Sequence, residues 1–382
     1  MELIFGIIVG LVVLVLLVTV HELGHAIAAR RNGVVVEEFG IGFPPRAWGK
    51  KLKNGVLFSL NWLPLGGFVK LQGEHDAADK EGDYGAATFW QKTKILLAGV
   101  GMNWVVAAVL LTALAWTGLP KITENQFTVA GDTTTIRKPV EVATIVKDSP
   151  ADKAGLKTGD QILRFAGEAV PTPADLTKKT EEFKGEQVEV VYSRDGVEAS
   201  AKVSLRSDNN DKKGYLGIGS GQRESIRATW SAPIVGVVTT GQFTLMTLQG
   251  LGDLVANTVS GIFLQFSPDQ TAREQASQNL QEASASVAGP IGILGTIFPA
   301  AEQAGLTQLI FLSAIISLTL AVMNILPIPA LDGGRWFVTA IFRLMKKPLT
   351  KEREEQIQGT GFMVLMALVL IVTIADVTKL FK

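Results

Sequence analysis

The chain has 382 residues with 36 basic and 36 acidic side chains, so its formal net charge is zero and gives no general attraction to nucleic acid. Hydrophobic residues make up 47% of the chain and charged residues 19%, which excludes disorder of the whole chain and is unusually apolar for a soluble protein. Cysteine is absent, which excludes disulfide and thiolate–metal scaffolds, so any metal site must use Asp, Glu or one of the three His.

The first predicted element is a membrane-spanning helix over 3–30. Residues 3–20 carry no charged side chain, a run long enough to enter a bilayer as a helix. A cleaved signal peptide is disfavoured, because no basic segment precedes the run and no small-residue cleavage site follows it. The helix is expected to end near Asn32 and Gly33, which suit a C-terminal cap.

His21, Glu22 and His25 lie at the end of this span, in the pattern HELGH. Residues i and i+4 of a helix project from the same face, so both imidazoles can bind one Zn²⁺. Glu22 lies beside them, where a carboxylate can accept a proton from water. HExxH also occurs by chance in soluble helices, but ionisable groups at membrane depth are costly and usually functional. The pattern therefore predicts a catalytic zinc site.

A β-rich loop is predicted over 34–73. Residues 56–71 are apolar, rich in β-forming residues and interrupted by Pro64 and a Gly-Gly pair. This pattern predicts a hairpin that dips toward the membrane and offers a strand edge to an extended peptide, with an ordinary surface hairpin as the alternative. His75 follows in a polar loop and is given no metal role.

A second span is predicted over 95–119, so residues 1–119 form the N-terminal half of a membrane unit. Residues 127–207 have a soluble composition and short β-patterned runs. Within them, ADKAGLKTGDQI at 151–162 resembles the A-x-x-A-G-L-K-x-G-D-x-I signature of bacterial PDZ domains. Such α/β domains bind extended peptides along a strand edge, often by a terminal carboxylate. We expect this domain either to bind a newly cut C-terminus or to act as a size filter.

Residues 228–288 are predicted to form an interfacial helix followed, over 266–287, by a polar linker or an exposed helix. Asp253 is the only charged residue from Ala228 to Pro268, so a further span over 233–264 is an alternative. The Gly, Thr and Gln content of this stretch and its weak hydrophobicity favour a helix that lies at the membrane surface.

Residues 289–382 are predicted to form the C-terminal half of the membrane unit, with spans over 309–331 and 359–378. Asp332 is the first charged residue after the third span and follows NILPIPAL at 324–331. Because Pro and the following Gly-Gly pair break helical geometry, this carboxylate can turn toward a partner. It is the candidate for the third protein ligand of a catalytic zinc, with a simple N-cap as the alternative role.

Together these motifs resemble the site-2 protease family of intramembrane zinc metalloproteases, and more narrowly its bacterial RseP/RasP group. The resemblance rests on HELGH in a first membrane helix, NxxPxPxLDGG in a later one and GPIGI before the third span, and it covers nearly the whole chain. It implies that His21, His25 and Asp332 bind zinc and that Glu22 is the catalytic base.

Two positions of the second span extend the resemblance. Gly99 and Asn103 match the family pattern, although Val100 stands where the family often has Pro. The resemblance implies that Asn103 and Asn324 help to hold the substrate backbone. Hydrogen bonds between helices are the alternative role of both amides.

Basic residues near the span ends predict the orientation in the cell inner or plasma membrane. They cluster after the first span and after the third, which places both segments, and the active site, toward the cytoplasm. The first cluster is Arg30, Arg31, Arg46, Lys50, Lys51 and Lys53, and the second is Arg335, Arg343, Lys346, Lys347, Lys351 and Arg353. The N-terminus, the PDZ domain and the C-terminus are then extracytoplasmic. One return span brings Asp332 to the depth of His21, whereas a further crossing over 233–264 would put it on the wrong side.

The sequence thus predicts a polytopic α-helical membrane protein with four transmembrane helices, a membrane-associated β-hairpin region and an inserted α/β PDZ domain. We expect it to hydrolyse peptide bonds in or near the transmembrane segments of single-pass proteins, within the lipid bilayer. The resemblance implies substrates already cut by another protease, such as anti-sigma factors, or signal-peptide remnants. Two alternatives are a non-catalytic PDZ scaffold with a degenerate metal site and a metal transporter, for which inverted repeats are missing.

Overall fold

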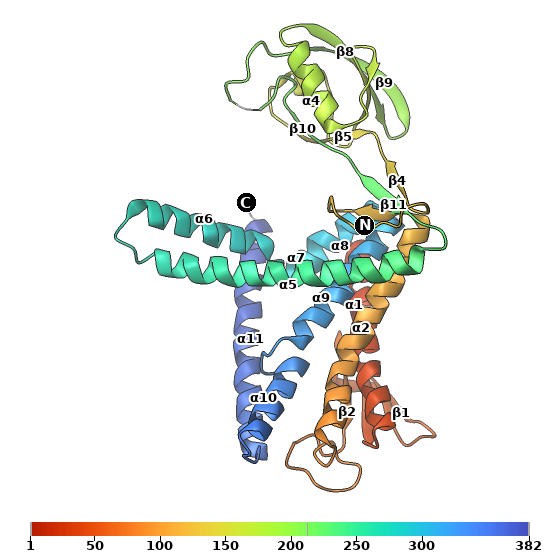
Figure 1. Cartoon of the computed structure of the whole chain (residues 1–382), viewed down its shortest axis with the longest axis vertical. Coiled ribbons are helices and arrows are strands. Elements are labelled where there is room, and N and C mark those ends of the chain that lie inside the picture. The colour runs from red at the N-terminus through yellow and green to blue at the C-terminus, as the bar shows by residue number, and fades with distance from the viewer. Residues whose placement is uncertain (1, 212, 381–382) are drawn as a thin grey trace. The chain divides into compact units, whose positions relative to one another are not determined.

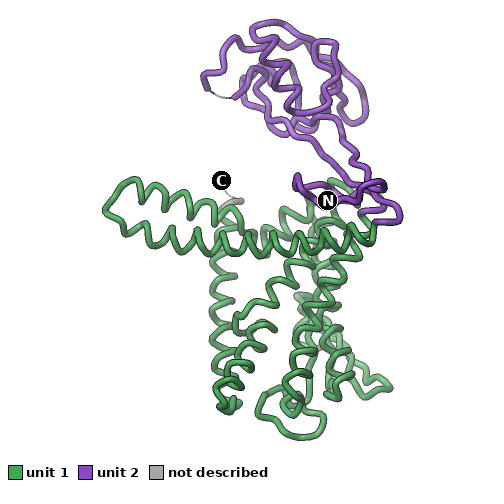
Figure 2. The backbone as a smooth tube through the Cα atoms, in the orientation of Figure 1, with its two compact units in different colours: residues 1–114, 232–382 green, residues 115–231 purple. Residues whose placement is uncertain are grey.

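The computed structural model describes residues 2–211 and 213–380, and the chain divides into two compact units (Figure 2). Unit 1 combines Met1–Leu114 with Ala232–Lys382, and unit 2 is the intervening Ala115–Ser231. Unit 2 includes the range 127–207 that the sequence predicts as a PDZ domain. The two ends of the chain therefore build one unit, and the middle of the chain is inserted into it.

Unit 1 is mainly helical. In chain order its helices are α1 (Glu2–Arg31), α2 (Phe89–Thr117), α5 (Ala232–Leu264), α6 (Gln270–Ser286), α7 (Pro290–Gly292), the π-helix η1 (Ile293–Ile297), α8 (Phe298–Gln303), α9 (Leu306–Ile325), α10 (Asp332–Leu344) and α11 (Lys351–Leu380). Among the described residues, five helices are long and apolar enough to cross a membrane, namely α1, α2, α5, α9 and α11. The bent pair of α6 and the segment Pro290–Gln303 would raise this number to six. The prediction of a helical membrane protein is confirmed at this level.

The long helices of unit 1 differ in direction (Figure 1). α1 and α9 run one way and α2 and α11 run the opposite way, whereas α5 lies across α2 and α11. The crossing helix is fastened by side chains from its neighbours. The indole N–H of Trp104 in α2 donates to Thr244 of α5 at 3.2 Å, and the rings of Phe243 and Phe311 meet edge to face at 6.2 Å, which joins α5 to α9.

The helix α9 ends at Ile325, whereas the predicted span runs to 331. Pro327 and Pro329 lack the N–H groups that would continue the helix, and Ala330 adopts a positive φ of 77°. The chain then turns back and begins α10 at Asp332. The start of α10 packs so closely on this turn that a Cβ at Gly334 would overlap the carbonyl group of Ile328.

The β-rich loop forms two long antiparallel strands, β1 (Val36–Lys51) and β2 (Leu57–Leu71). Both strands bend, and Phe39 of β1 pairs with Val69 and also with Phe58. The final part of β2 lies beside α1, where a Cβ at Gly67 would be 3.6 Å from Cγ of Glu22. A strand edge is thereby brought to the HExxH helix.

Unit 2 contains a sheet with the strand order β10-β5-β6-β8-β9, and β7 pairs with β6. Its elements are β5 (Val140–Ile145), α3 (Pro150–Lys153), β6 (Gln161–Phe165), β7 (Glu168–Ala169), α4 (Pro173–Glu182), β8 (Gln187–Arg194), β9 (Val197–Ser204) and β10 (Ile218–Gly221). A small second sheet has the order β3 (Leu119–Lys121), β11 (Glu224–Arg227), β4 (Thr134–Arg137).

The core of unit 2 follows from strand alternation. Val188, Val190 and Tyr192 of β8 point inward while their neighbours face outward, as expected for a sheet with one buried face. They pack with Ile162 and Phe165 of β6, both fully buried. The core is thus formed within the unit by its own strands and helices.

Candidate metal centre

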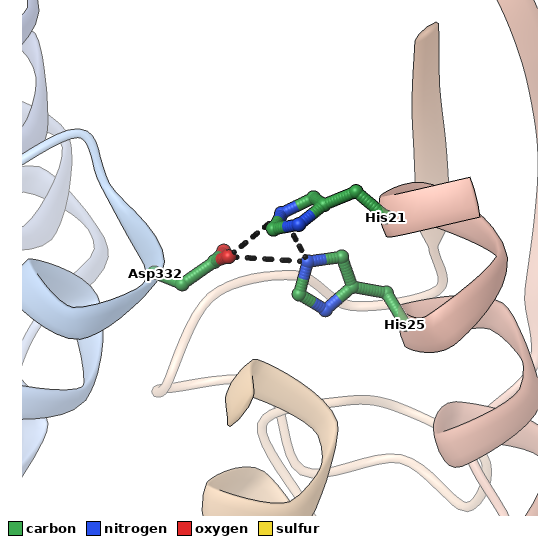
Figure 3. Close-up of side chains that lie close together, drawn as sticks. All are labelled: His21, His25 and Asp332. Carbon is green, nitrogen blue, oxygen red and sulfur yellow. Dashed lines mark hydrogen bonds and ion pairs between the residues drawn. The ribbon is translucent and has the colours of Figure 1, made fainter. Parts of the chain in front are cut away.

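His21 and His25 lie one turn apart on α1 and point the same way (Figure 3). Both side chains are buried, at 7% and 8% exposure. Their Nε2 atoms are 3.2 Å apart, and the rings meet nearly at right angles. Helical spacing therefore brings together two imidazole nitrogens that can bind the same ion.

Asp332 meets these imidazoles from α10, at the far end of the sequence (Figure 3). Its Oδ2 lies 3.0 Å from Nε2 of His21 and 3.2 Å from Nε2 of His25. Ligand atoms bound tetrahedrally to zinc at about 2.0–2.1 Å are separated by roughly 3.3 Å. The three side chains thus fit a zinc ion, and among the described residues they are the one group of this kind.

The outer nitrogens of the two imidazoles also have partners. Nδ1 of His25 lies 2.8 Å from the carbonyl oxygen of Ile95, which can accept its proton and leave Nε2 free to bind metal. Nδ1 of His21 lies 3.4 Å from Nδ2 of Asn103, a fully buried residue whose Oδ1 has no hydrogen-bond partner. If the side-chain amide of Asn103 were rotated by about 180°, its Oδ1 would accept a hydrogen bond from the Nδ1–H of His21.

Glu22 and the strand edge share one pocket with the metal group. The pocket has a volume of about 120 Å³ and is lined by Glu22, His25, Asp332, Val69, Leu71, Glu74, Tyr84, Ile95, Leu96 and Arg335. The backbone of Val69 lies against the Glu22 carboxylate. Burial raises the pKa of Glu74 above its usual range, although the nearby Arg335 guanidinium opposes this rise. The carboxylate of Glu22, two members of the His21–His25–Asp332 group and the end of β2, which pairs with β1 along one side, therefore face one space.

The other predicted site residues lie outside this pocket. Asn103 faces His21 from α2, as described above. Asn324 donates from Nδ2 to the carbonyl oxygen of Leu320 on its own helix, at 3.0 Å. Nε2 of His75 lies 3.6 Å from Oε1 of Glu355 and is not part of the metal group.

Arg335, Tyr84 and Glu74 line the pocket but were not expected from the sequence. The sequence spacing could have indicated Arg335, because this residue lies one helical turn after Asp332 and so shares its face of α10. For Tyr84 and Glu74 the sequence gives no comparable spacing, since their contacts with Arg335 bridge distant parts of the chain.

Gly99 on α2 lets the two helices approach at the metal site. A Cβ at this position would lie 2.7 Å from Cε1 and 2.8 Å from Nε2 of His21, which is closer than real Cβ contacts. We expect Gly99→Ala to displace the imidazoles and to lower both metal content and cleavage rate at least about tenfold. Metal analysis of the purified protein and a cleavage assay measure the two effects.

Gly101 provides the matched control, because a Cβ there would meet nothing within 4 Å. Gly101→Ala should leave metal content and cleavage unchanged. Equal behaviour of the two variants would contradict the close approach of α2 to His21.

The apolar helices and the HExxH-plus-carboxylate site together define a membrane-embedded metalloprotease. The sequence pattern of Peptidase family M50 matches residues 9–368, so the chain belongs to this family, the site-2 proteases. The family prediction is confirmed, and the scaffold alternative is not favoured.

Relatives match along almost the whole chain. A protein of Clostridium perfringens that is named as a zinc metalloprotease is 33% identical over 361 residues, covering 94% of this chain and 95% of its own. The zinc metalloprotease RasP of Geobacillus kaustophilus is 26% identical, with 96% of both chains covered. The regulator of sigma-W protease RasP of Bacillus subtilis is 25% identical, again with 96% of both chains covered. The PDZ domain of an SdrC-like protein from Listeria monocytogenes is 22% identical over 25% of this chain and 93% of its own, with a TM-score of 0.20.

Proposed function

We propose that His21, His25 and Asp332 bind one zinc ion and that Glu22 is the base with which this protease hydrolyses peptide bonds of membrane proteins. The observation that carries the proposal is the convergence of three ligand atoms at 3.0–3.2 Å, beside a carboxylate that is not one of them. The names of the relatives, which include zinc, support the choice of metal.

Zinc, when bound, supplies Lewis acidity that polarises a peptide carbonyl and makes water easier to deprotonate. Glu22 then accepts the proton of the attacking water and passes it to the leaving amine. Ile95 and Asn103 orient the two imidazoles so that both Nε2 atoms are directed at the proposed metal position.

The strand edge beside Glu22 gives the substrate a place to bind. A transmembrane helix hides its peptide bonds in its own hydrogen bonds, so it must unwind locally before it is cut. The unwound segment needs new backbone partners. Residues 67–71 of β2 pair with residues 36–41 of β1 along one side, so we propose that the segment pairs along the other side, next to Glu22 and His25. A direct contact of Asn103 or Asn324 with the substrate is a further proposal that rests on the family resemblance.

Four membrane spans are proposed, formed by α1, α2, α9 and α11. The alternating directions of these helices and the crossed direction of α5 support this count (Figure 1). With α5 at the membrane surface, Asp332 and His21 reach the same depth. The proposed orientation places Asp332 toward the cytoplasm, with the PDZ domain in unit 2 outside, where it binds new C-termini or limits substrate size.

Labelling of Asp253→Cys tests the position of α5. The chain has no Cys of its own, and Asp253 is exposed near the middle of α5. We expect a membrane-impermeant maleimide to label this cysteine from outside the cell, and Lys53→Cys, after β1, only from the cytoplasmic side. Protection of the Asp253→Cys variant from the reagent on both sides would show that α5 crosses the bilayer.

The proposed substrates are single-pass membrane proteins that another protease has already shortened, with anti-sigma factors as one class. The name of the Bacillus subtilis relative, a regulator of sigma-W protease, supports this class. We expect the protein in proteoliposomes to cut such a shortened substrate within its membrane segment, to stop when a chelator removes the metal, and to recover with zinc. Mass spectrometry of the products locates the cut. Cleavage that continues without metal would refute the proposal.

A further inference from the structure

The chain that leads to Asp332 is a turn, held by backbone bonds between Leu326, Ile328 and Leu331 and by the N–H of Ala330, which donates to Oε1 of Gln358. α10 begins directly at Asp332, and its N-cap Leu331 makes no side-chain capping bond. The preceding residues 326–331 contain two Pro and a positive φ at Ala330, and they form no regular structure. A ligand that must meet two imidazoles within tenths of an ångström needs further constraints on α10 beyond this turn.

Arg335 supplies contacts that can act as this constraint. It lies one turn after Asp332 on the same helix and bonds to two other segments. Its Nε donates to Oε1 of Glu354 in α11 at 3.2 Å, and its Nη2 donates to the carbonyl oxygen of Glu74. Its Cζ lies 4.6 Å from the ring centroid of Tyr84, in cation–π contact.

The partners of Arg335 are themselves held in place. Glu354 is 3% exposed, and its second oxygen accepts the backbone N–H of Asp76 at 2.8 Å. Asp76 in turn pairs with Lys92 of α2, whose Nζ lies 5.5 Å from the ring centroid of the buried Tyr84. The loop after β2 and the helices α2 and α11 thus form a fixed frame around one guanidinium.

We propose that Arg335 is a positioning residue that holds Asp332 at the metal. The inference rests on the proposed role of Asp332 as a ligand. Arg335, Glu74 and Asp332 line the catalytic pocket together, and the same three residues line a second pocket of about 320 Å³ next to it. The planar guanidinium of Arg335 has several N–H donors in fixed directions, so it can bond Glu354 and Glu74 at once. A lysine ammonium lacks this fixed geometry.

The test compares Arg335→Ala, Arg335→Lys and Glu354→Gln with wild type in detergent. The zinc dissociation constant is measured by competition with a chelator, and thermal unfolding of the metal-free protein reports the fold. We expect Arg335→Ala to weaken zinc binding at least about tenfold, because α10 would lose its bonds to Glu354 and Glu74 and Asp332 would shift from the two imidazoles. Arg335→Lys should recover part of the affinity, and Glu354→Gln, which removes one of two acceptor oxygens, should weaken binding to a smaller extent.

Arg343→Ala is the matched control, because this residue lies on the same helix, over the ring of Phe89, and away from the pocket. It should keep the wild-type dissociation constant. Wild-type affinity in Arg335→Ala would overturn the inference, and if that variant does not fold, wild-type affinity in Glu354→Gln overturns it. Asp332→Ala separates the proposed ligand role of Asp332 from the positioning role of Arg335. Zinc retained in Asp332→Ala would refute the ligand set. Zinc lost in Asp332→Ala but bound normally in Arg335→Ala would refute only the positioning role.

Discussion

Replacement of Glu22 by Gln is expected to abolish peptide-bond hydrolysis while leaving the fold and metal binding intact. Gln has the same shape as Glu but cannot accept a proton, and Glu22 lies in the catalytic pocket without being part of the metal group. Loss of a general base costs about 10²–10⁴-fold in rate. Cleavage of a shortened single-pass substrate in proteoliposomes measures the loss, and metal analysis of the same sample measures the retained ion.

Glu81→Gln is a suitable control, because Glu81 is exposed in the loop after β2 and does not line the pocket. It should cleave at the wild-type rate. If Glu22→Gln also kept the wild-type rate, Glu22 would not be the base, whatever its position beside the two His residues.

His21→Ala and Asp332→Ala are both expected to remove most of the bound zinc. Wild-type protein purified in detergent should carry one zinc per chain, because His21, His25 and Asp332 form a group that could supply the three protein ligands of a catalytic site. Removal of either ligand leaves two, which are too few for stable binding. Activity should be lost in parallel, while His75→Ala, which changes a histidine outside the group, should keep both zinc and activity.

Zinc retained after Asp332→Ala would place the third ligand elsewhere. The proposed position of α5 at the membrane surface would lose its basis as well, since it depends on Asp332 and His21 meeting at one depth. The measurement therefore tests the metal site and the membrane topology together.

The convergence of His21, His25 and Asp332 could be predicted because each residue has a strong local signal. His21 and His25 have helical i, i+4 spacing at the end of an apolar run, and Asp332 is the first charge after another such run. These signals depend on helix geometry and on the cost of charge in lipid, which sequence records directly.

Other features could not be predicted because they depend on contacts between distant segments. The frame around Arg335 joins Glu74, Tyr84 and Glu354, and no spacing rule relates these positions. The double pairing of Phe39 arises from bends in both strands. The end of α9 at Ile325 reflects Pro327, whose ring restricts the preceding residue as well as its own backbone, so the helix ends before it.

Asp332 follows His21 by 311 positions, so the two halves of the candidate metal site leave the ribosome far apart in time. While the first two helices and the inserted unit are being synthesised, two imidazoles lie in the membrane without their carboxylate. The nascent chain thus lacks a complete catalytic centre until α10 has been made and has folded back onto α1.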